Sequence, residues 1–237
     1  QTQLVACTIA SPRSILTLEI ILMSTVESTI TTFFSQYPLH RYGKGQIIMR
    51  PGEEVQQILY LEDGNIIQYD ITPAGSEVVL NIFKPRAFFP MSNVINNVTN
   101  QYFFEAASPV AARVIPKSHA VTFLRDNPEA TFDLLSRVYR GTDGIIRRMA
   151  HLMGGNAKSR LVFELLNSAY RFGTTDADGV TIVMISENDL AKRSGLTRET
   201  ISRNMKQLKQ SGCVKVHHYG IEIPDLAKLE DTIGLAL

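Results

Sequence analysis

The chain has 237 residues, of which 44% are hydrophobic and 20% charged, and its formal net charge is +1. This composition is typical of a folded globular protein and excludes a disordered or fibrous chain. The length suits one large domain or two small ones. A net charge close to zero does not by itself indicate that the chain binds nucleic acid. Only the local distribution of charge can show whether a nucleic-acid-binding surface is present.

The first 22 residues contain no Met and few charges. An apolar run at their end includes Glu19 and is too short to span a bilayer, and no basic segment precedes it as in a signal peptide. We treat residues 1–27 as an N-terminal extension and leave open whether residues 1–22 are native. The two cysteines, Cys7 and Cys213, lack the spacing of a metal site and favour a reducing, cytoplasmic location.

Residues 28–126 are predicted to form a β-rich domain. Between His40 and Ile115, short runs of β-branched and aromatic residues alternate with turn pairs such as Pro51-Gly52 and Asp63-Gly64. Short strands at regular spacing favour a barrel, roll or sandwich.

Residues 127–154 are predicted to form one long helix with a hinge. Asn127 can N-cap it, with Pro128 at the first helical position. Some 25 residues span roughly 37 Å, which is long for a helix that packs on one small sheet. A core helix and a dimer helix that packs on its twin both stay open, and we prefer the dimer. The candidate dimer-interface residues are Phe132, Leu135, Tyr139, Ile146 and Met149.

Residues 155–237 are predicted to hold a helix over 157–173, a strand over 180–185, two further helices, and two strands around a turn at Tyr219-Gly220. We interpret this order as a winged helix–turn–helix.

Capping signals place the two adjacent helices. Ser186 and Asp189 form a capping-box pattern at the start of the first helix. Gly195 can supply the positive φ of a tight turn, and Thr197 can N-cap the second helix. The pattern is that of a DNA-binding helix–turn–helix.

The second helix separates into two faces. Ile201, Met205 and Leu208 form an apolar stripe. Between Lys192 and His218 there are seven Lys and Arg residues and one acidic residue, so the local formal charge is +6. Such a patch attracts phosphate, while Arg and Glu side chains on it can bond to guanine and cytosine edges. The candidate base-reading residues are Arg198, Glu199, Ser202 and Arg203, and the candidate DNA-backbone contacts are Thr197, Lys206, Lys209, Lys215 and His217.

Two other interpretations of this segment were weighed. A solvated charged helix explains most basic faces, but it does not account for the caps, the spacing and the following hairpin together. The pair His217-His218 suggests a metal site, but adjacent strand residues point to opposite faces, so we expect no metal.

The motif LTRETISR, Leu196–Arg203, resembles the CRP/FNR family of cyclic-AMP receptor and fumarate–nitrate reduction regulators, and the likeness covers about residues 28–230. The resemblance implies an α+β fold: an N-terminal cyclic-nucleotide-binding-like β-roll (jelly roll), a long dimerisation helix and a C-terminal winged helix–turn–helix. It also implies a bacterial, homodimeric transcription regulator that binds double-stranded DNA and contacts RNA polymerase.

The same resemblance suggests how DNA is recognised. An Arg-Glu-x-x-x-Arg pattern implies Arg198, Glu199 and Arg203, while a related branch uses Glu-x-x-Ser-Arg, which implies Glu199, Ser202 and Arg203. Both patterns fit, so we expect a palindrome with TGA-containing half-sites without choosing a branch.

The sensor domain departs from the family pattern. Nucleotide-binding members use a Gly-Glu motif and a later Arg-Ser or Arg-Thr pair. Here Arg86 stands where glycine is usual, and no Arg lies between Ser92 and Ala112. We therefore expect no cyclic nucleotide.

Two distant cysteines are too few for an iron–sulfur cluster. His40, His119 and His151 leave haem open, but lone histidines are more often structural or exposed, so we expect no haem.

The replaced stretch is rich in amides and aromatics. Two interpretations stay open for Asn93, Asn96, Asn97 and Tyr102. They are ordinary loop and core residues, or they line a pocket for a small-molecule effector other than a cyclic nucleotide. A constitutive DNA binder with a vestigial, ligandless sensor is the alternative. We expect no enzyme, because the sequence offers no nucleophile–base pair, phosphate loop or metal cluster.

Overall fold

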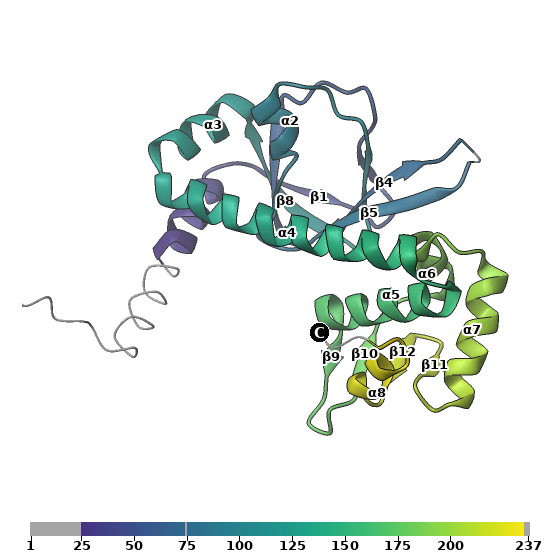
Figure 1. The fold of residues 1–237 in the computed structure, drawn as a ribbon. Helices are drawn as coiled ribbons and strands as arrows, with labels where there is room; N and C mark the ends of the chain where they lie inside the picture. Colours follow the sequence, from purple (N-terminus) through teal and green to yellow (C-terminus); the bar gives the residue numbers. More distant parts are fainter. Residues whose placement is uncertain (1–24, 74, 235–237) are drawn as a thin grey trace, which may run out of the picture. The chain divides into compact units, whose positions relative to one another are not determined.

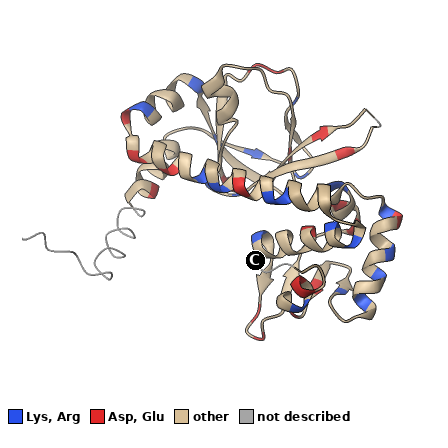
Figure 2. Cartoon of the chain, in the orientation of Figure 1, with Lys and Arg blue, Asp and Glu red and all other residues tan. Residues whose placement is uncertain are grey.

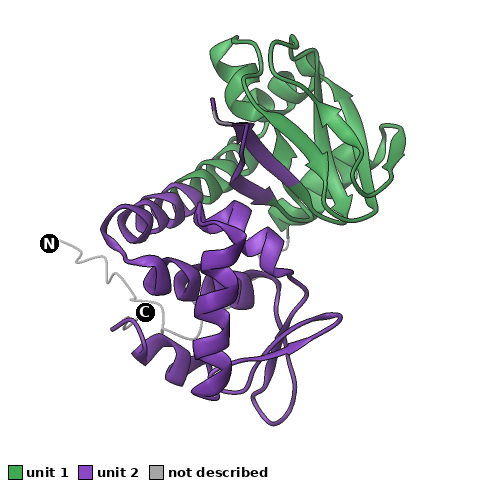
Figure 3. Ribbon diagram, turned by 90° about the vertical axis from the view of Figure 1, so that its right-hand side faces the viewer, with its two compact units in different colours: residues 1–66, 83–139 green, residues 67–82, 140–237 purple. Residues whose placement is uncertain are grey.

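The computed structural model describes residues 25–73 and 75–234, coloured along the chain in Figure 1. The expected extension over residues 1–27 lies outside these residues as far as residue 24, and residues 25–35 are helical. The chain divides into two compact units (Figure 3). Among the described residues, unit 1 holds residues 25–66 and 83–139, and unit 2 holds residues 67–73, 75–82 and 140–234.

Unit 1 contains a four-stranded sheet in the order β1-β8-β3-β6. These strands are β1 (Leu39–Tyr42), β8 (Val110–Pro116), β3 (Gln57–Asp63) and β6 (Phe88–Phe89). β8 runs antiparallel to both β1 and β3, with Ile58 opposite Ile115. The short strands β2 (Ile47–Met49) and β7 (Phe103–Ala106) form a further antiparallel pair.

The core of unit 1 forms where the apolar residues of these strands meet the helices. Ile58, Leu61 and Ile115 have no exposed surface. Phe34, from helical residues 25–35, stacks on Tyr60 of β3 with ring centroids 4.4 Å apart. The remaining helices of this part are α2 (Met91–Asn96) and α3 (Lys117–Asp126).

The long helix α4 runs from Pro128 to Gly154, as predicted, and begins in unit 1 and ends in unit 2. Asn127 differs from expectation, because its side-chain amide donates to the Phe123 carbonyl, 2.8 Å away, instead of capping α4. The reason is local: α3 ends one residue before Asn127, so its amide satisfies a carbonyl that the end of that helix leaves open.

Unit 2 combines a pair of neighbouring strands, β4 (Ile66–Ile71) and β5 (Glu77–Phe83), with the C-terminal elements. These elements are α5 (Ala157–Phe172), β9 (Thr174–Thr175), β10 (Thr181–Val183), α6 (Glu187–Ser194), α7 (Arg198–Gln210), β11 (Lys215–His217), β12 (Gly220–Ile223) and α8 (Leu226–Asp231). The four strands among these C-terminal elements form a sheet in the order β11-β12-β10-β9.

The core of unit 2 is built on α5, whose N-cap Asn156 accepts from the Ser159 N–H at 3.0 Å. Leu161 and Leu165 of α5 are fully buried in one cluster with Leu190 of α6 and Ile201 of α7. Burying one such side chain contributes roughly 1.5–3 kcal/mol, so this cluster fixes both helices against α5.

The fold is therefore α+β, with an N-terminal β-roll, a long helix and a C-terminal winged helix–turn–helix, as the sequence predicted. No helix in the described part of the chain is both long enough and apolar enough to cross a membrane.

A pair of glycines in unit 1 tests how tightly the β3–β4 turn packs. Gly64 and Gly52 have nearly the same positive φ, 84° and 85°. A Cβ at Gly64 would lie 2.2 Å from the Pro109 carbonyl oxygen, whereas a Cβ at Gly52 meets nothing within 4 Å. We expect Gly52→Ala to cost about 1–2 kcal/mol of backbone strain. Gly64→Ala should cost roughly 1–3 kcal/mol more from overpacking, measured by urea unfolding. Equal losses would contradict this account of the turn.

Candidate nucleic-acid interface

The two helices of the helix–turn–helix begin at the predicted N-caps, and the predicted glycine lies in the turn between them. The Ser186 hydroxyl accepts from the Asp189 N–H at 3.1 Å, and the Asp189 carboxylate accepts from the Ser186 N–H at 3.2 Å. Gly195 adopts φ 63°, and the Thr197 hydroxyl accepts from the Thr200 N–H at 3.3 Å. The capping box, the glycine turn and the second N-cap are thus confirmed.

One side of α7 is anchored in the core. Ile201, Met205 and Leu208 are buried, which confirms the predicted stripe. Asn204 lies on the same side, 8% exposed, and its amide donates to the Thr200 carbonyl at 2.8 Å. The periodicity of apolar residues gave no signal for this buried amide, because its partner is a backbone carbonyl of the same helix.

The turn between α6 and α7 is held from α5 by a residue that sequence reasoning missed. The Arg160 guanidinium donates to the carbonyls of Ser194 and, at 3.3 Å, Gly195. The Ser194 hydroxyl donates to the Leu190 carbonyl at 2.6 Å. The carbonyls of Ser194 and Gly195 lie at the C-terminal end of α6, where the backbone acceptors of a helix have no partners within the helix. The sequence carried no signal for Arg160, since its acceptors are backbone atoms 34 and 35 positions away.

The opposite side of α7 faces outward. The four candidate base-reading residues, Arg198, Glu199, Ser202 and Arg203, are all exposed, as are the candidate backbone contacts Thr197, Lys206 and Lys209. Figure 2 shows the basic positions along this helix.

Not all of the basic segment contributes to that face. Lys192 forms an ion pair with Glu77, and the Arg193 guanidinium donates to the Ser168 hydroxyl at 3.0 Å. The positive charge counted from the sequence is therefore divided among α7, Lys215 and the contacts that Lys192 and Arg193 make within unit 2.

Glu199 is the one acidic residue on the outward face. Hydrogen bonds from its own backbone N–H and from the Thr197 hydroxyl, together with the nearby Arg198 charge, lower the pKa of Glu199. The first turn of a helix also favours negative charge. The carboxylate is therefore ionised at neutral pH and acts as an acceptor, which is the form that accepts from cytosine N4.

The wing consists of β11 and β12, and its turn lies at His218-Tyr219. The prediction of Tyr219-Gly220 was wrong by one residue, because Gly220 belongs to β12 and pairs with His217. A Cβ on Gly220 would lie 2.4 Å from the Val183 carbonyl oxygen. The glycine is thus needed where β12 approaches β10, and the turn itself does not require it.

A carboxylate partly neutralises the wing. The Lys215 ammonium lies 2.8 Å from one Glu222 oxygen, and the His217 Nε2 lies 2.9 Å from the other. Hydrogen bonds from Lys215 and then from His217 lower the pKa of Glu222. Glu222 lies just beyond the charged segment counted from the sequence, and its alternation on β12 opposite Lys215 was the signal that could have found it.

The four candidate effector residues lie on α2 and the segment after it. The Asn93 side-chain amide donates to the Thr99 carbonyl at 2.9 Å, and the side-chain Oδ1 of Asn97 accepts from the Lys117 ammonium at 2.7 Å. Asn96 is exposed, while Tyr102 packs partly buried against the core of unit 1. Asn97 lines a cavity of about 190 Å³, and the other three are not among its lining residues.

Aromatic side chains fill the neighbouring part of unit 1. Phe89 stacks on Phe83 at 4.8 Å and on Phe104 at 5.3 Å between ring centroids. Arg86 adopts φ 73°, so the backbone keeps the left-handed conformation that favours glycine at this position. The Arg86 side chain forms an ion pair with Glu27.

The candidate dimer residues lie along one exposed stripe of α4. Phe132 is 70% exposed and Tyr139 64%, and only Ala130 of the whole helix is buried. The residues on this stripe are Phe132, Leu135, Tyr139, Ile146 and Met149. Their intervals of three, four, seven and three residues follow a heptad pattern.

Comparison with known proteins agrees with this architecture. Residues 39–127 match the model of the cyclic nucleotide-binding domain, and residues 159–232 match the model of the Crp-like helix-turn-helix domain. A similar curated protein is the global nitrogen regulator of Nostoc sp. (strain PCC 7120), 26% identical over 77% of this chain and 83% of that protein. The cAMP-activated global transcriptional regulator CRP of Pasteurella multocida is 22% identical over 81% and 92%.

Solved structures show the same fold. The c-di-GMP responsive global regulator CLP of Xanthomonas campestris superposes with a TM-score of 0.74 at 18% identity, covering 84% of this chain and 99% of that one. A CRP/FNR family transcriptional regulator of Thermus thermophilus gives a TM-score of 0.70 at 21% identity, with the same coverage.

The two domain matches and the helix–turn–helix define a transcription regulator with a DNA-binding domain at its C-terminal end. The chain belongs to the CRP/FNR family of transcriptional regulators.

The wing ion pairs lead to a prediction about salt dependence. We expect Glu222→Gln to free Lys215 and His217, so that the variant binds DNA of any sequence more tightly. The slope of log K against log salt concentration should steepen by about 1, as for one added phosphate contact. Fluorescence anisotropy over a salt series measures this slope. Asp231→Asn removes one negative charge from α8 as a control, and an equal change in both variants would contradict a specific role for Glu222.

Proposed function

We propose that the chain acts as a homodimer that reads a palindrome with TGA-containing half-sites through α7, under the control of an effector other than cyclic AMP. The observation that carries the proposal is the exposure of Arg198, Glu199, Ser202 and Arg203 on one face of a helix whose other face is anchored in the core. We propose RNA polymerase as the protein partner of this regulator.

The chemistry of these side chains suits base recognition. An Arg fork bonds the O6 and N7 of guanine, and an ionised Glu accepts from cytosine N4. A carboxylate on a basic face is repelled by phosphate, so Glu199 weakens general attraction to DNA and contributes where a cytosine amino group is present. Lys206 and Lys209, further along the exposed side, suit phosphate contacts that position the helix without specifying sequence.

A palindrome requires two copies of α7, and the exposed stripe of α4 supports such a pairing. Phe132 and Tyr139, seven residues apart, and Leu135 between them repeat as the a and d positions of a coiled coil do. A helix with this much exposed apolar surface gains stability by packing on a second copy. Two reading helices one DNA turn apart then face successive major grooves.

The sensor part supports an effector without the cyclic-nucleotide chemistry. The stretch between Ser92 and Ala112 provides no Arg for a phosphate, and the Phe83, Phe89 and Phe104 rings pack against one another nearby. The residues that we propose for the effector site are Asn93, Asn96, Asn97 and Tyr102. Two of them, Asn93 and Asn97, already form hydrogen bonds within unit 1. The alternative is a constitutive DNA binder.

Selection of bound sequences from a random DNA pool tests the proposal, and running it with and without cell metabolites separates a regulated from a constitutive binder. We expect Arg203→Ala to abolish the sequence-specific shift, because each lost bidentate base contact costs about 1–3 kcal/mol per half-site. Lys209→Ala is the matched control and should weaken selected and random DNA equally. Unchanged specificity in Arg203→Ala would refute the assignment of α7.

The dimer is tested separately from DNA binding. Tyr139→Glu places a carboxylate at the middle of the exposed stripe, where two like charges would face each other across the interface. We expect the folded variant to elute at the monomer mass in light-scattering chromatography and to lose affinity for the palindrome. Arg147→Glu, on α4 but outside the stripe, should stay dimeric. A dimeric Tyr139→Glu would place the interface elsewhere.

A further inference from the structure

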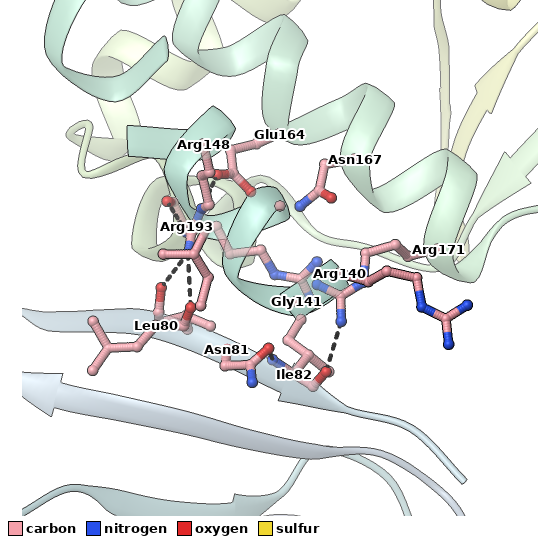
Figure 4. Close-up of a pocket in the computed structure, with 13 residues that line it drawn as sticks. Leu80, Asn81, Ile82, Arg140, Gly141, Arg148, Glu164, Asn167, Arg171 and Arg193 are labelled. Carbon is pink, nitrogen blue, oxygen red and sulfur yellow. Dashed lines mark hydrogen bonds and ion pairs between the residues drawn. The ribbon is translucent and has the colours of Figure 1, made fainter. Parts of the chain in front are cut away.

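Four arginines line a cavity of about 310 Å³ within unit 2 (Figure 4). Arg140 and Arg148 come from α4, Arg171 from α5 and Arg193 from α6, and the edge of β5 closes the remaining side. Glu164 is the one acidic residue among those that line it, so the lining carries a formal charge of +3 from four arginines and one carboxylate.

Arg148 is the structural member of this group. Its Nε lies 2.5 Å from the carboxylate of Glu164, which is 1% exposed. Its other nitrogens donate to the carbonyls of Val79 at 2.9 Å, Leu80 at 3.1 Å and Arg193 at 2.6 Å. Arg148 and Glu164 therefore neutralise each other and use their hydrogen bonds to join α4, α5, α6 and β5.

The other three arginines, Arg140, Arg171 and Arg193, form no ion pair with a described residue. Arg171 donates to the Ile82 carbonyl at 2.8 Å and Arg193 to the Ser168 hydroxyl, which are both neutral acceptors. In the described part of the chain, Arg140 has neither an ion pair nor a hydrogen bond, and it is exposed at the cavity rim. Burial is the main cause that lowers the pKa of Arg171 and of Arg193, and the nearby Arg148 lowers both further. The Glu164 carboxylate acts in the opposite direction on both pKa values, and Asp189 does so on that of Arg193. The guanidinium groups of Arg171 and Arg193 are thus held partly out of water, and the exposed Arg140 lines the same cavity.

We propose that this cavity binds a small anion that carries at least two negative charges on phosphoryl or carboxylate groups, held by Arg140, Arg171 and Arg193. Guanidinium forks bond such groups with two parallel hydrogen bonds, and partial exclusion of water strengthens each charged contact. The cavity volume lies at the lower end of the range for small-molecule sites, which excludes a large ligand.

The position of the cavity gives the bound anion a structural effect. Arg193 belongs to the last turn of α6, directly before the turn that leads to α7. An anion shared by Arg140, Arg171 and Arg193 joins α4, α5 and α6, and it raises the apparent stability of the protein because it binds the folded state. The inference does not depend on DNA recognition by α7.

The test uses the full-length protein with two probes, inorganic pyrophosphate and citrate, in calorimetry and thermal unfolding. Sodium chloride at equal ionic strength controls for general screening. We expect one probe or both to bind and to raise the unfolding temperature, and the comparison tells phosphoryl from carboxylate ligands. Arg140→Gln should weaken binding about tenfold, as expected for one lost charge-assisted contact. This side chain is exposed and without a partner among the described residues, so the variant is expected to fold.

Further variants distinguish the cavity from the basic face of α7. Arg171→Gln should also weaken binding, whereas Arg147→Gln on α4 outside the cavity and Arg203→Gln on α7 should bind the probe as the unchanged chain does. The proposal is overturned if neither probe binds, if Arg140→Gln and Arg171→Gln bind normally, or if Arg203→Gln loses binding while Arg140→Gln keeps it. The last result would place the anion on the DNA-facing side.

Discussion

The packing of α6 and α7 on α5 is the constraint on which the interface depends. Leu161 and Leu165 present one continuous apolar surface, and Leu190 and Ile201 are buried against it. Because the buried sides of both helices are fixed, the direction of the outward side of α7 is fixed as well. A polar face on a loosely held helix would attract phosphate, but base recognition needs side chains held within a fraction of an ångström by the elements behind them.

Local signals explain which parts of the structure could be predicted. The capping box at Ser186, the turn at Gly195 and the stripe that includes Ile201 depend on residues within a few positions of each other, so spacing reveals them. Arg160 and Arg148 escaped because their partners come from distant elements, and a single sequence does not show which elements meet. Gly220 was misassigned for the same reason, since the Val183 carbonyl determines its role. Glu222 could have been found, since it lies opposite Lys215 in the predicted hairpin.

The domain that matches the cyclic nucleotide-binding model has an aromatic and amide-rich interior. Arg86 has a left-handed backbone, which glycine adopts without strain. Phe89 and Phe104 lie in the core, and Asn100 is buried through bonds to the Arg50 and Tyr102 carbonyls. The sequence predicted the loss of the phosphate ligands, but it did not show how far these side chains are already engaged.

The end of α6 is held by two arginines that come from other helices. Arg148 of α4 donates a hydrogen bond to the Arg193 carbonyl, and Arg160 of α5 donates to the next two carbonyls. The carbonyls at the end of α6, which have no partner within the helix, therefore accept hydrogen bonds from two other helices. Within unit 2, these hydrogen bonds join the C-terminal half of α4 directly to the end of α6, and join α5 to the turn before α7. A rotation of that half of α4 would therefore strain the bonds at the end of α6, directly before the turn that leads to α7.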